Sequence, residues 1–119
     1  LSMSEEKRSM EAQQVGGQDV ELIPFALIAD AGEAKSLAFM ALNEAKQGNF
    51  EACDDYMKQS DEAYLRAHNT QTEILVKEAN GEHMPVNVML VHAQDHLMTS
   101  NLARELIREL IELYRVRNA

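Results

Sequence analysis

The 119-residue sequence contains few of the residues that build small sheets or disulfide-rich folds. It has no tryptophan, one cysteine, two prolines and five glycines, and aromatic residues make up only 5% of the chain. A lone Cys53 cannot form a disulfide within the chain, which favours a reducing, cytoplasmic compartment. The start of the chain has no secretory apolar segment, and no apolar run approaches the roughly 18 residues that cross a bilayer. We therefore expect no membrane insertion.

The chain carries a large negative net charge. Twenty acidic residues stand against 11 basic ones, which gives a formal net charge of −9. Such a chain repels phosphates, so neither nucleic acid nor an anionic membrane is an expected partner. Basic proteins and metal cations are better candidates. The length and the 45% hydrophobic content fit one domain, and the residue usage favours helices, so the predicted class is all-α.

Apolar residues recur at helical spacing in three segments, which predict helices over 21–47, about 50–76 and 86–117. A short break at Gly48 and Asn49 predicts a tight reversal, with Asn49 capping the second helix. A longer loop is expected over 77–85. The predicted fold is an up-down-up, antiparallel three-helix bundle over residues 21–119.

Residues 1–20 lack sustained apolar periodicity and end near the pair Gly16-Gly17, so we expect them to form a mobile leader. The opening Leu1-Ser2-Met3 is consistent with a remnant of cloning.

The third helix places three ionisable residues on one stripe. At 100° per residue, Asp95 lies about 60° to one side of His92 and His96 about 40° to the other. The opposite side of the same turns is also apolar, with Leu90, Val91, Leu97 and Met98. A helix at the edge of one small bundle cannot bury both sides. We therefore expect self-association through this helix, the alternative being that the helix is central in its own bundle.

These residue types allow several chemistries. The neutral ring nitrogen of histidine is a competent nucleophile, which makes His92 and His96 the strongest chemical candidates, although both could be buried polar groups. An Asp95 near a symmetry axis would meet its own copies and need a cation or a shared proton. The spacing His92-x-x-Asp95-His96 also looks like the H-x-x-E-H pattern of zinc hydrolases, but no third ligand is evident. A purely structural helical oligomer is the remaining alternative.

Three segments together resemble one family. LVHAQDHLMTS at 90–100, followed by LARELI at 102–107, is similar to the signature helix of the lactose/cellobiose-type enzyme IIA components of the bacterial phosphotransferase system. AGEAKSLA at 31–38 with AKQGNF at 45–50, and AHNTQT at 67–72, match that family's first helix and turn and its second helix. The likeness covers about residues 22–114. The residues around His92 and Arg104 are more similar to the cellobiose/chitobiose branch than to the lactose branch.

The resemblance implies a homotrimer of three-helix bundles that accepts phosphate from the carrier HPr and passes it to a cysteine of the IIB subunit, for uptake of a β-linked disaccharide. The membrane IIC subunit selects the sugar. The family's phosphorylated histidine corresponds to His92, modified at Nε2, and its axial aspartate, associated with Mg²⁺ or a similar cation, to Asp95.

Three further residues could support that reaction. His96 lies one helical turn from His92 and could donate a hydrogen bond to the phosphate or only pack. His68 and Gln71 share one face of the second helix and could orient His92, although a hydrogen bond inside the bundle is the simpler interpretation. Cys53 is expected to be a small buried apolar residue.

Overall fold

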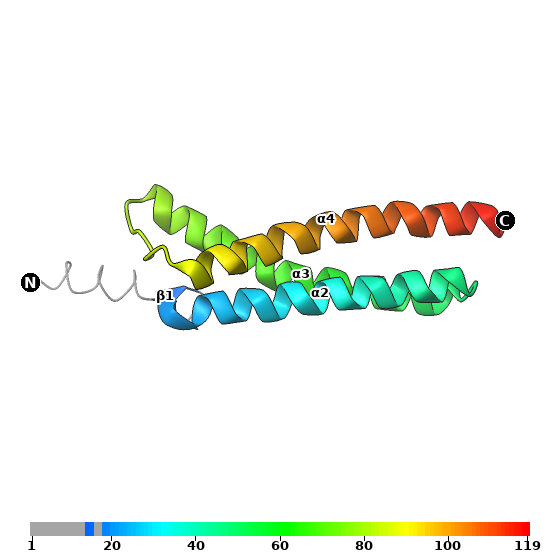
Figure 1. The fold of residues 1–119 in the computed structure, drawn as a ribbon, viewed down its shortest axis with the longest axis horizontal. Coiled ribbons are helices and arrows are strands. Elements are labelled where there is room, and N and C mark those ends of the chain that lie inside the picture. The colour runs from blue at the N-terminus through cyan, green and yellow to red at the C-terminus, as the bar shows by residue number, and fades with distance from the viewer. Residues whose placement is uncertain (1–13, 16–17) are drawn as a thin grey trace, which may run out of the picture.

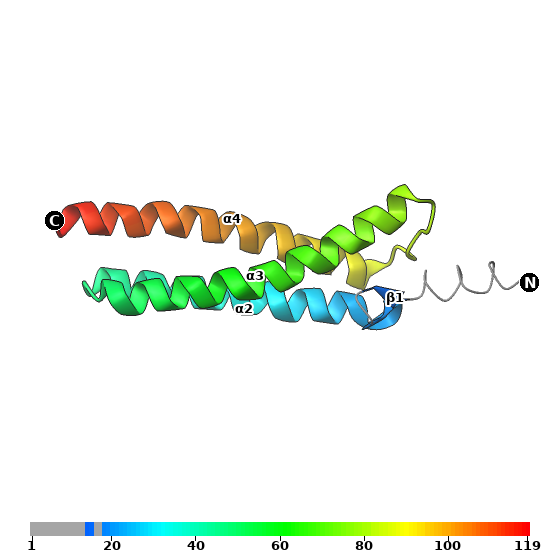
Figure 2. The same cartoon turned by 180° about the vertical axis from the view of Figure 1, so that it is seen from behind.

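The computed structural model describes residues 14–15 and 18–119, and three long helices account for most of them. α2 spans Ile23–Lys46, α3 spans Phe50–Ala79 and α4 spans Val88–Arg117. α2 and α4 run in the same direction and α3 runs against them (Figures 1 and 2). The predicted all-α, up-down-up bundle is therefore confirmed for one chain.

A minimal strand pair and one helical turn precede the bundle. β1 (Gln14–Val15) pairs antiparallel with β2 (Gln18–Asp19), and the 3-10 turn η1 spans Val20–Leu22. The sequence did not predict these elements. Residues 1–13 and 16–17 of the expected leader lie outside the described residues.

The reversal between α2 and α3 is as short as predicted. Gly48 adopts a φ of 81°, a conformation that side chains with a Cβ rarely adopt, and this lets the chain turn back within three residues. Asn49 occupies the N-cap position of α3 as predicted, but its side chain makes no cap hydrogen bond. Its amide instead donates to Glu44 Oε2 over 3.0 Å, which ties the turn to the end of α2.

The second connection differs from its predicted bounds. α3 continues through Ala79 and ends at Asn80-Gly81, where Gly81 has a φ of 85°. α4 begins only after Asn87, whose side chain accepts a hydrogen bond from the Leu90 backbone N–H over 2.9 Å. The loop is therefore 80–87 rather than 77–85, because the capping asparagine and the left-handed glycine set the helix ends more strongly than Pro85 does.

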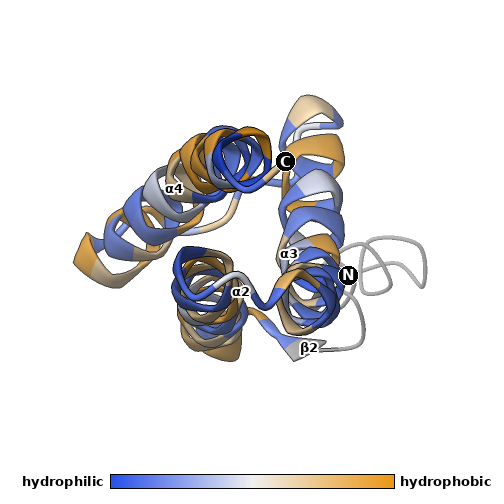
Figure 3. Cartoon of the chain, turned by 90° about the vertical axis from the view of Figure 1, so that its right-hand side faces the viewer, coloured by the Kyte–Doolittle hydropathy of each residue, from blue (hydrophilic) through white to orange (hydrophobic). Residues whose placement is uncertain are grey.

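The core consists of two apolar clusters separated by a polar layer. The cluster near the start of α2 includes Ile23, Leu27 and Leu97, and the other includes Leu42, Met57 and Ile111. Five alanines of α2 are fully buried, which lets its partners approach closely: Ala31, Ala34, Ala38, Ala41 and Ala45. Viewed end-on, the three helices surround a common centre (Figure 3). None of the helices in the described residues is long and apolar enough to cross a membrane.

Candidate functional site

The first turns of α4 are held firmly to the rest of the bundle. The Asn87 cap fixes where the helix starts, one turn before His92. Leu90, Ala93 and Leu97 are buried, and Ala93 and Leu97 belong to the apolar cluster that α2 and α3 share with α4. Because these positions face inward, His92, Asp95 and His96 lie toward the outer side of the helix. The helix therefore presents its ionisable side chains from a rigid backbone.

His92 and His96 lie together on this outer side, as their spacing predicted. Their ring centroids are 4.5 Å apart and the rings are nearly perpendicular, at 89°. His92 is exposed and His96 is half-buried. His92 is thus accessible to another protein, while His96 is positioned beside its ring.

Asp95 is also exposed, and in the described part of the chain its carboxylate has no ion-pair partner. The neighbouring Thr99 Oγ1 donates to the backbone carbonyl oxygens of Asp95 over 2.8 Å and of His96 over 3.4 Å. These bonds leave the Asp95 carboxylate oxygens available. The carboxylate can therefore accept a cation or a donor from outside the protomer.

An exposed apolar stripe runs along α4 on both sides of Asp95. Met98 and Leu113 are 69% and 65% exposed, respectively. Together with these two residues and Asp95, the other large exposed apolar residues of the stripe form a series with a spacing of three or four positions: Val88, Val91, Leu102, Leu106 and Leu110. The prediction that α4 has two apolar sides is confirmed. The four residues expected on one side are nevertheless divided between the two sides, because Leu90 and Leu97 are buried while Val91 and Met98 are exposed.

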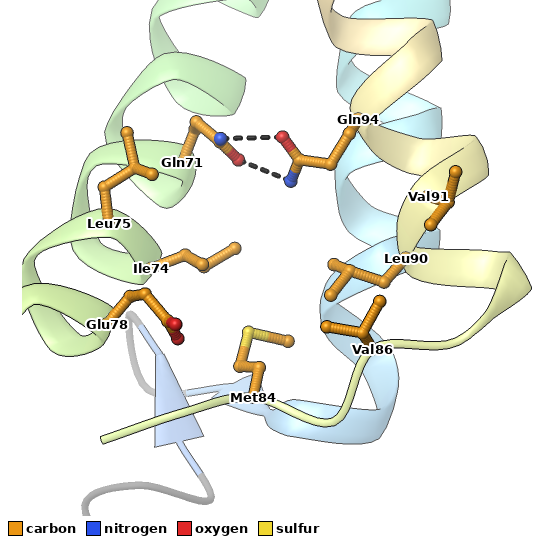
Figure 4. Close-up of a pocket in the computed structure, with 9 residues that line it drawn as sticks. All are labelled: Gln71, Ile74, Leu75, Glu78, Met84, Val86, Leu90, Val91 and Gln94. Carbon is orange, nitrogen blue, oxygen red and sulfur yellow. Dashed lines mark hydrogen bonds between the residues drawn. The ribbon is translucent and has the colours of Figure 1, made fainter. Parts of the chain in front are cut away.

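In the described residues, the side chains of Gln71 and His68 contact Gln94 and Tyr64, respectively, and not His92. The side-chain amides of Gln71 and Gln94 exchange two hydrogen bonds of 2.7 Å, which join α3 to α4 (Figure 4). The amide pair lies beside an apolar pocket of about 250 Å³ whose lining includes Ile74, Met84 and Leu90. His68 is exposed, and its ring lies 5.8 Å from the Tyr64 ring.

One protomer offers at most two adjacent ligands for a metal at this site. In the described residues, no group of three or more histidine, cysteine, aspartate or glutamate side chains is placed to hold a metal ion. A catalytic zinc site has three protein ligands and an open position. The His92–His96 pair in a single chain therefore falls one ligand short of the set that the hydrolase alternative requires.

Sequence reasoning missed a second polar cluster, centred on Arg104. This residue is only 5% exposed, and its Nε donates to Ser60 Oγ over 2.9 Å, while its guanidinium pairs with Asp61 and stacks on the Tyr64 ring. Burial lowers the pKa of Arg104, and Asp61 opposes that effect. The only sequence signal was the position of Arg104 on the apolar face of α4, between Leu97 and Ile107.

Comparisons with known proteins agree with this architecture. The family described as "PTS system, Lactose/Cellobiose specific IIA subunit" matches residues 22–115. The N,N'-diacetylchitobiose-specific EIIA component of Escherichia coli is 50% identical over 101 residues, which are 85% of this chain and 87% of that protein.

Two solved structures share the fold. The cellobiose-specific enzyme IIA of Bacillus anthracis has a TM-score of 0.81 at 44% identity and covers 85% of this chain and 93% of its own. IIA(Chitobiose) of Escherichia coli, solved in a complex with HPr, has a TM-score of 0.74 at 48% identity and covers 86% of this chain and 99% of its own.

Proposed function

Because the chain belongs to the lactose/cellobiose-specific IIA family of the phosphotransferase system, we propose that it carries a phosphoryl group on His92 between two other proteins of that system. Members of the family are phosphotransferase components. The observation that carries the assignment to this residue is the exposed His92 ring on a helix whose opposite face is buried. An acceptor in a protein relay must be reachable from outside yet fixed in direction, and His92 meets both conditions.

The reaction needs little machinery beyond that position. The His92 ring nitrogen attacks the phosphorus of a phosphohistidine on HPr, the nitrogen–phosphorus bond of the donor breaks, and the group moves to His92. A thiolate of the IIB subunit then attacks the same phosphorus, and the His92 ring leaves. We assign the second ring, His96, to supporting the phosphate or the His92 ring from 4.5 Å away. We assign structural roles to His68 and Gln71, since they contact Tyr64 and Gln94.

HPr is the proposed phosphoryl donor. The similar Escherichia coli protein IIA(Chitobiose) was solved in complex with HPr. The net charge of −9 suits a partner with a basic surface, and complementary charge speeds encounter in a way that salt weakens.

We further propose that three copies associate through the exposed stripe of α4. Apolar residues such as Met98, Leu102 and Leu106 would be buried between the copies in such an assembly and no longer exposed to water. Asp95 lies within the stripe, so its copies would meet near a threefold axis and repel one another. Carboxylate oxygens are suitable ligands for Mg²⁺, and a cation held by Asp95 from each copy would neutralise that repulsion.

For the transported sugar we propose a β-linked disaccharide of the cellobiose or chitobiose type. The support is the likeness to the chitobiose-specific component of Escherichia coli and the cellobiose-specific enzyme of Bacillus anthracis. The sugar itself would contact the membrane subunit and not this chain.

Phosphoryl transfer to the purified protein tests the proposal. With enzyme I, HPr and phosphoenolpyruvate, intact mass spectrometry should show one added phosphate per chain, and acid should remove it. A folded protein that stays unmodified in a mixture that phosphorylates HPr would contradict the function.

A further inference from the structure

The phosphoryl reaction needs only the His92 ring as acceptor, whereas His92 and His96 lie together as a pair. The two side chains stand one turn apart on α4, and their ring centroids are 4.5 Å apart. Histidines at this spacing can chelate one cation, because zinc binds ring nitrogens at about 2.0–2.1 Å and a tetrahedral site then separates two of them by about 3.3 Å. The exposed His92 ring has room to turn from its perpendicular position toward that arrangement.

The surroundings of the pair favour a cation. The net charge is −9, and Asp95 lies between the two histidines in sequence. The arginines of the described ion pairs lie elsewhere: Arg66 with Asp30 and Glu33, Arg104 and Arg108 with Asp61, and Arg115 with Asp54. No described salt bridge brings a basic side chain to His92 or His96.

We infer that His92 and His96 together bind one borderline divalent transition metal, with zinc as the representative ion, and that this metal competes with the phosphoryl group for His92. Each ring donates one nitrogen lone pair to the ion, and water fills the remaining positions. A His92 nitrogen bound to the metal has no lone pair left to attack phosphorus. The site is distinct from the cation proposed at Asp95, which lies about 60° around the helix from His92 and about 100° from His96. The competition rests on the proposed function, but the metal site itself does not.

Calorimetric titration of the full chain with zinc chloride tests the site. One zinc ion should bind per chain, and His92→Gln and His96→Gln should each weaken binding by about tenfold or more, because a chelate becomes a single ligand. His83 pairs with Glu78 over 2.8 Å and is the competing location, so His83→Gln is the matched control and should leave the affinity unchanged. Asp95→Asn should also retain binding.

Three results would overturn the site: no zinc binding at millimolar concentration, equal affinity after loss of either ring of the pair, or loss of binding in His83→Gln. The competition is measured separately as phosphoryl uptake with and without zinc. Zinc should slow uptake on this chain and a chelator should restore it, while phosphorylation of HPr by enzyme I continues. Unchanged uptake at saturating zinc would contradict the competition. A chain that binds zinc but takes up no phosphate without it would instead contradict the proposed function.

Discussion

Arg104 Nε donates to Ser60 Oγ over 2.9 Å, and both side chains are buried where α3 meets α4. Ser60 in turn donates to the Ala34 carbonyl oxygen over 2.6 Å, so the two hydrogen bonds connect all three helices. This polar layer lies between the two apolar clusters of the core. It fixes the relative heights of the helices, because an apolar contact can slide whereas a buried hydrogen bond cannot shift without being lost.

Replacing Arg104 with alanine should therefore lower the free energy of unfolding by about 2–4 kcal/mol, since the change removes the Ser60 bond, the Asp61 pair and the Tyr64 stack together. Denaturant unfolding followed by circular dichroism measures the loss.

Arg108→Ala is the matched control. Arg108 pairs with the same Asp61 oxygen, but its side chain is 49% exposed, so its loss should cost less than about 1 kcal/mol. Equal losses for the two variants would show that the buried layer contributes no more than a surface ion pair.

Asp95→Leu should keep the trimer, or tighten it, without added Mg²⁺, because three crowded carboxylates become apolar contacts at the proposed axis. Analytical ultracentrifugation with and without EDTA makes the comparison. If the variant sediments as a monomer, Asp95 does not lie at an axis.

Leu106→Glu places a charge in the same exposed stripe and should produce monomers.

Cys53 should be chemically inert in the folded protein. Burial raises the pKa of its thiol, and Arg115 only partly opposes this, so little thiolate forms at neutral pH. The unfolded thiol ionises at a lower pH than the folded one, so this group's contribution to stability falls as the pH rises past about 8.5. Thiol labelling at pH 7.5 should be slow in the native state and fast in denaturant. Native labelling at the rate of an exposed thiol would contradict the burial.

Gln71→Leu should lower the free energy of unfolding by about 1 kcal/mol, because Gln94 loses both of its hydrogen bonds to the Gln71 amide at a half-buried position. Phosphoryl uptake should stay near the wild-type rate, since Gln71 pairs with Gln94 and not with His92. His68→Gln should leave uptake equally intact. A large fall in the uptake rate of either variant, with the fold retained, would assign that residue to the reaction.

Periodicity was sufficient to predict the bundle, because each helix has a long apolar pattern and the Gly48 turn permits a tight reversal. It was less reliable at the helix ends. α3 continues past residue 76 because the polar residues that follow are compatible with a helix. The start of α4 is set by the Asn87 cap, and the sequence alone does not show whether the helix begins near Pro85 or after Asn87.

The site was predictable to the extent that it lies on one helix. The spacing of His92 and His96 fixes their closeness, because both belong to α4. The contacts between helices were not predictable in the same way. Gln71 and Gln94 are 23 positions apart and Ser60 and Arg104 are 44 apart, so each pair depends on how the helices are aligned. A buried arginine on an apolar face could have been noticed in the sequence, but its partners could not.

The most direct test of the phosphoryl carrier is to compare wild-type protein, His92→Gln and His68→Gln in one mixture of enzyme I, HPr and phosphoenolpyruvate. Peptide mapping at neutral pH should locate a single phosphate on His92 in the wild-type protein and in His68→Gln, and none in His92→Gln, with all three showing the same helical circular dichroism. Phosphate on His92→Gln at the wild-type yield would contradict the account.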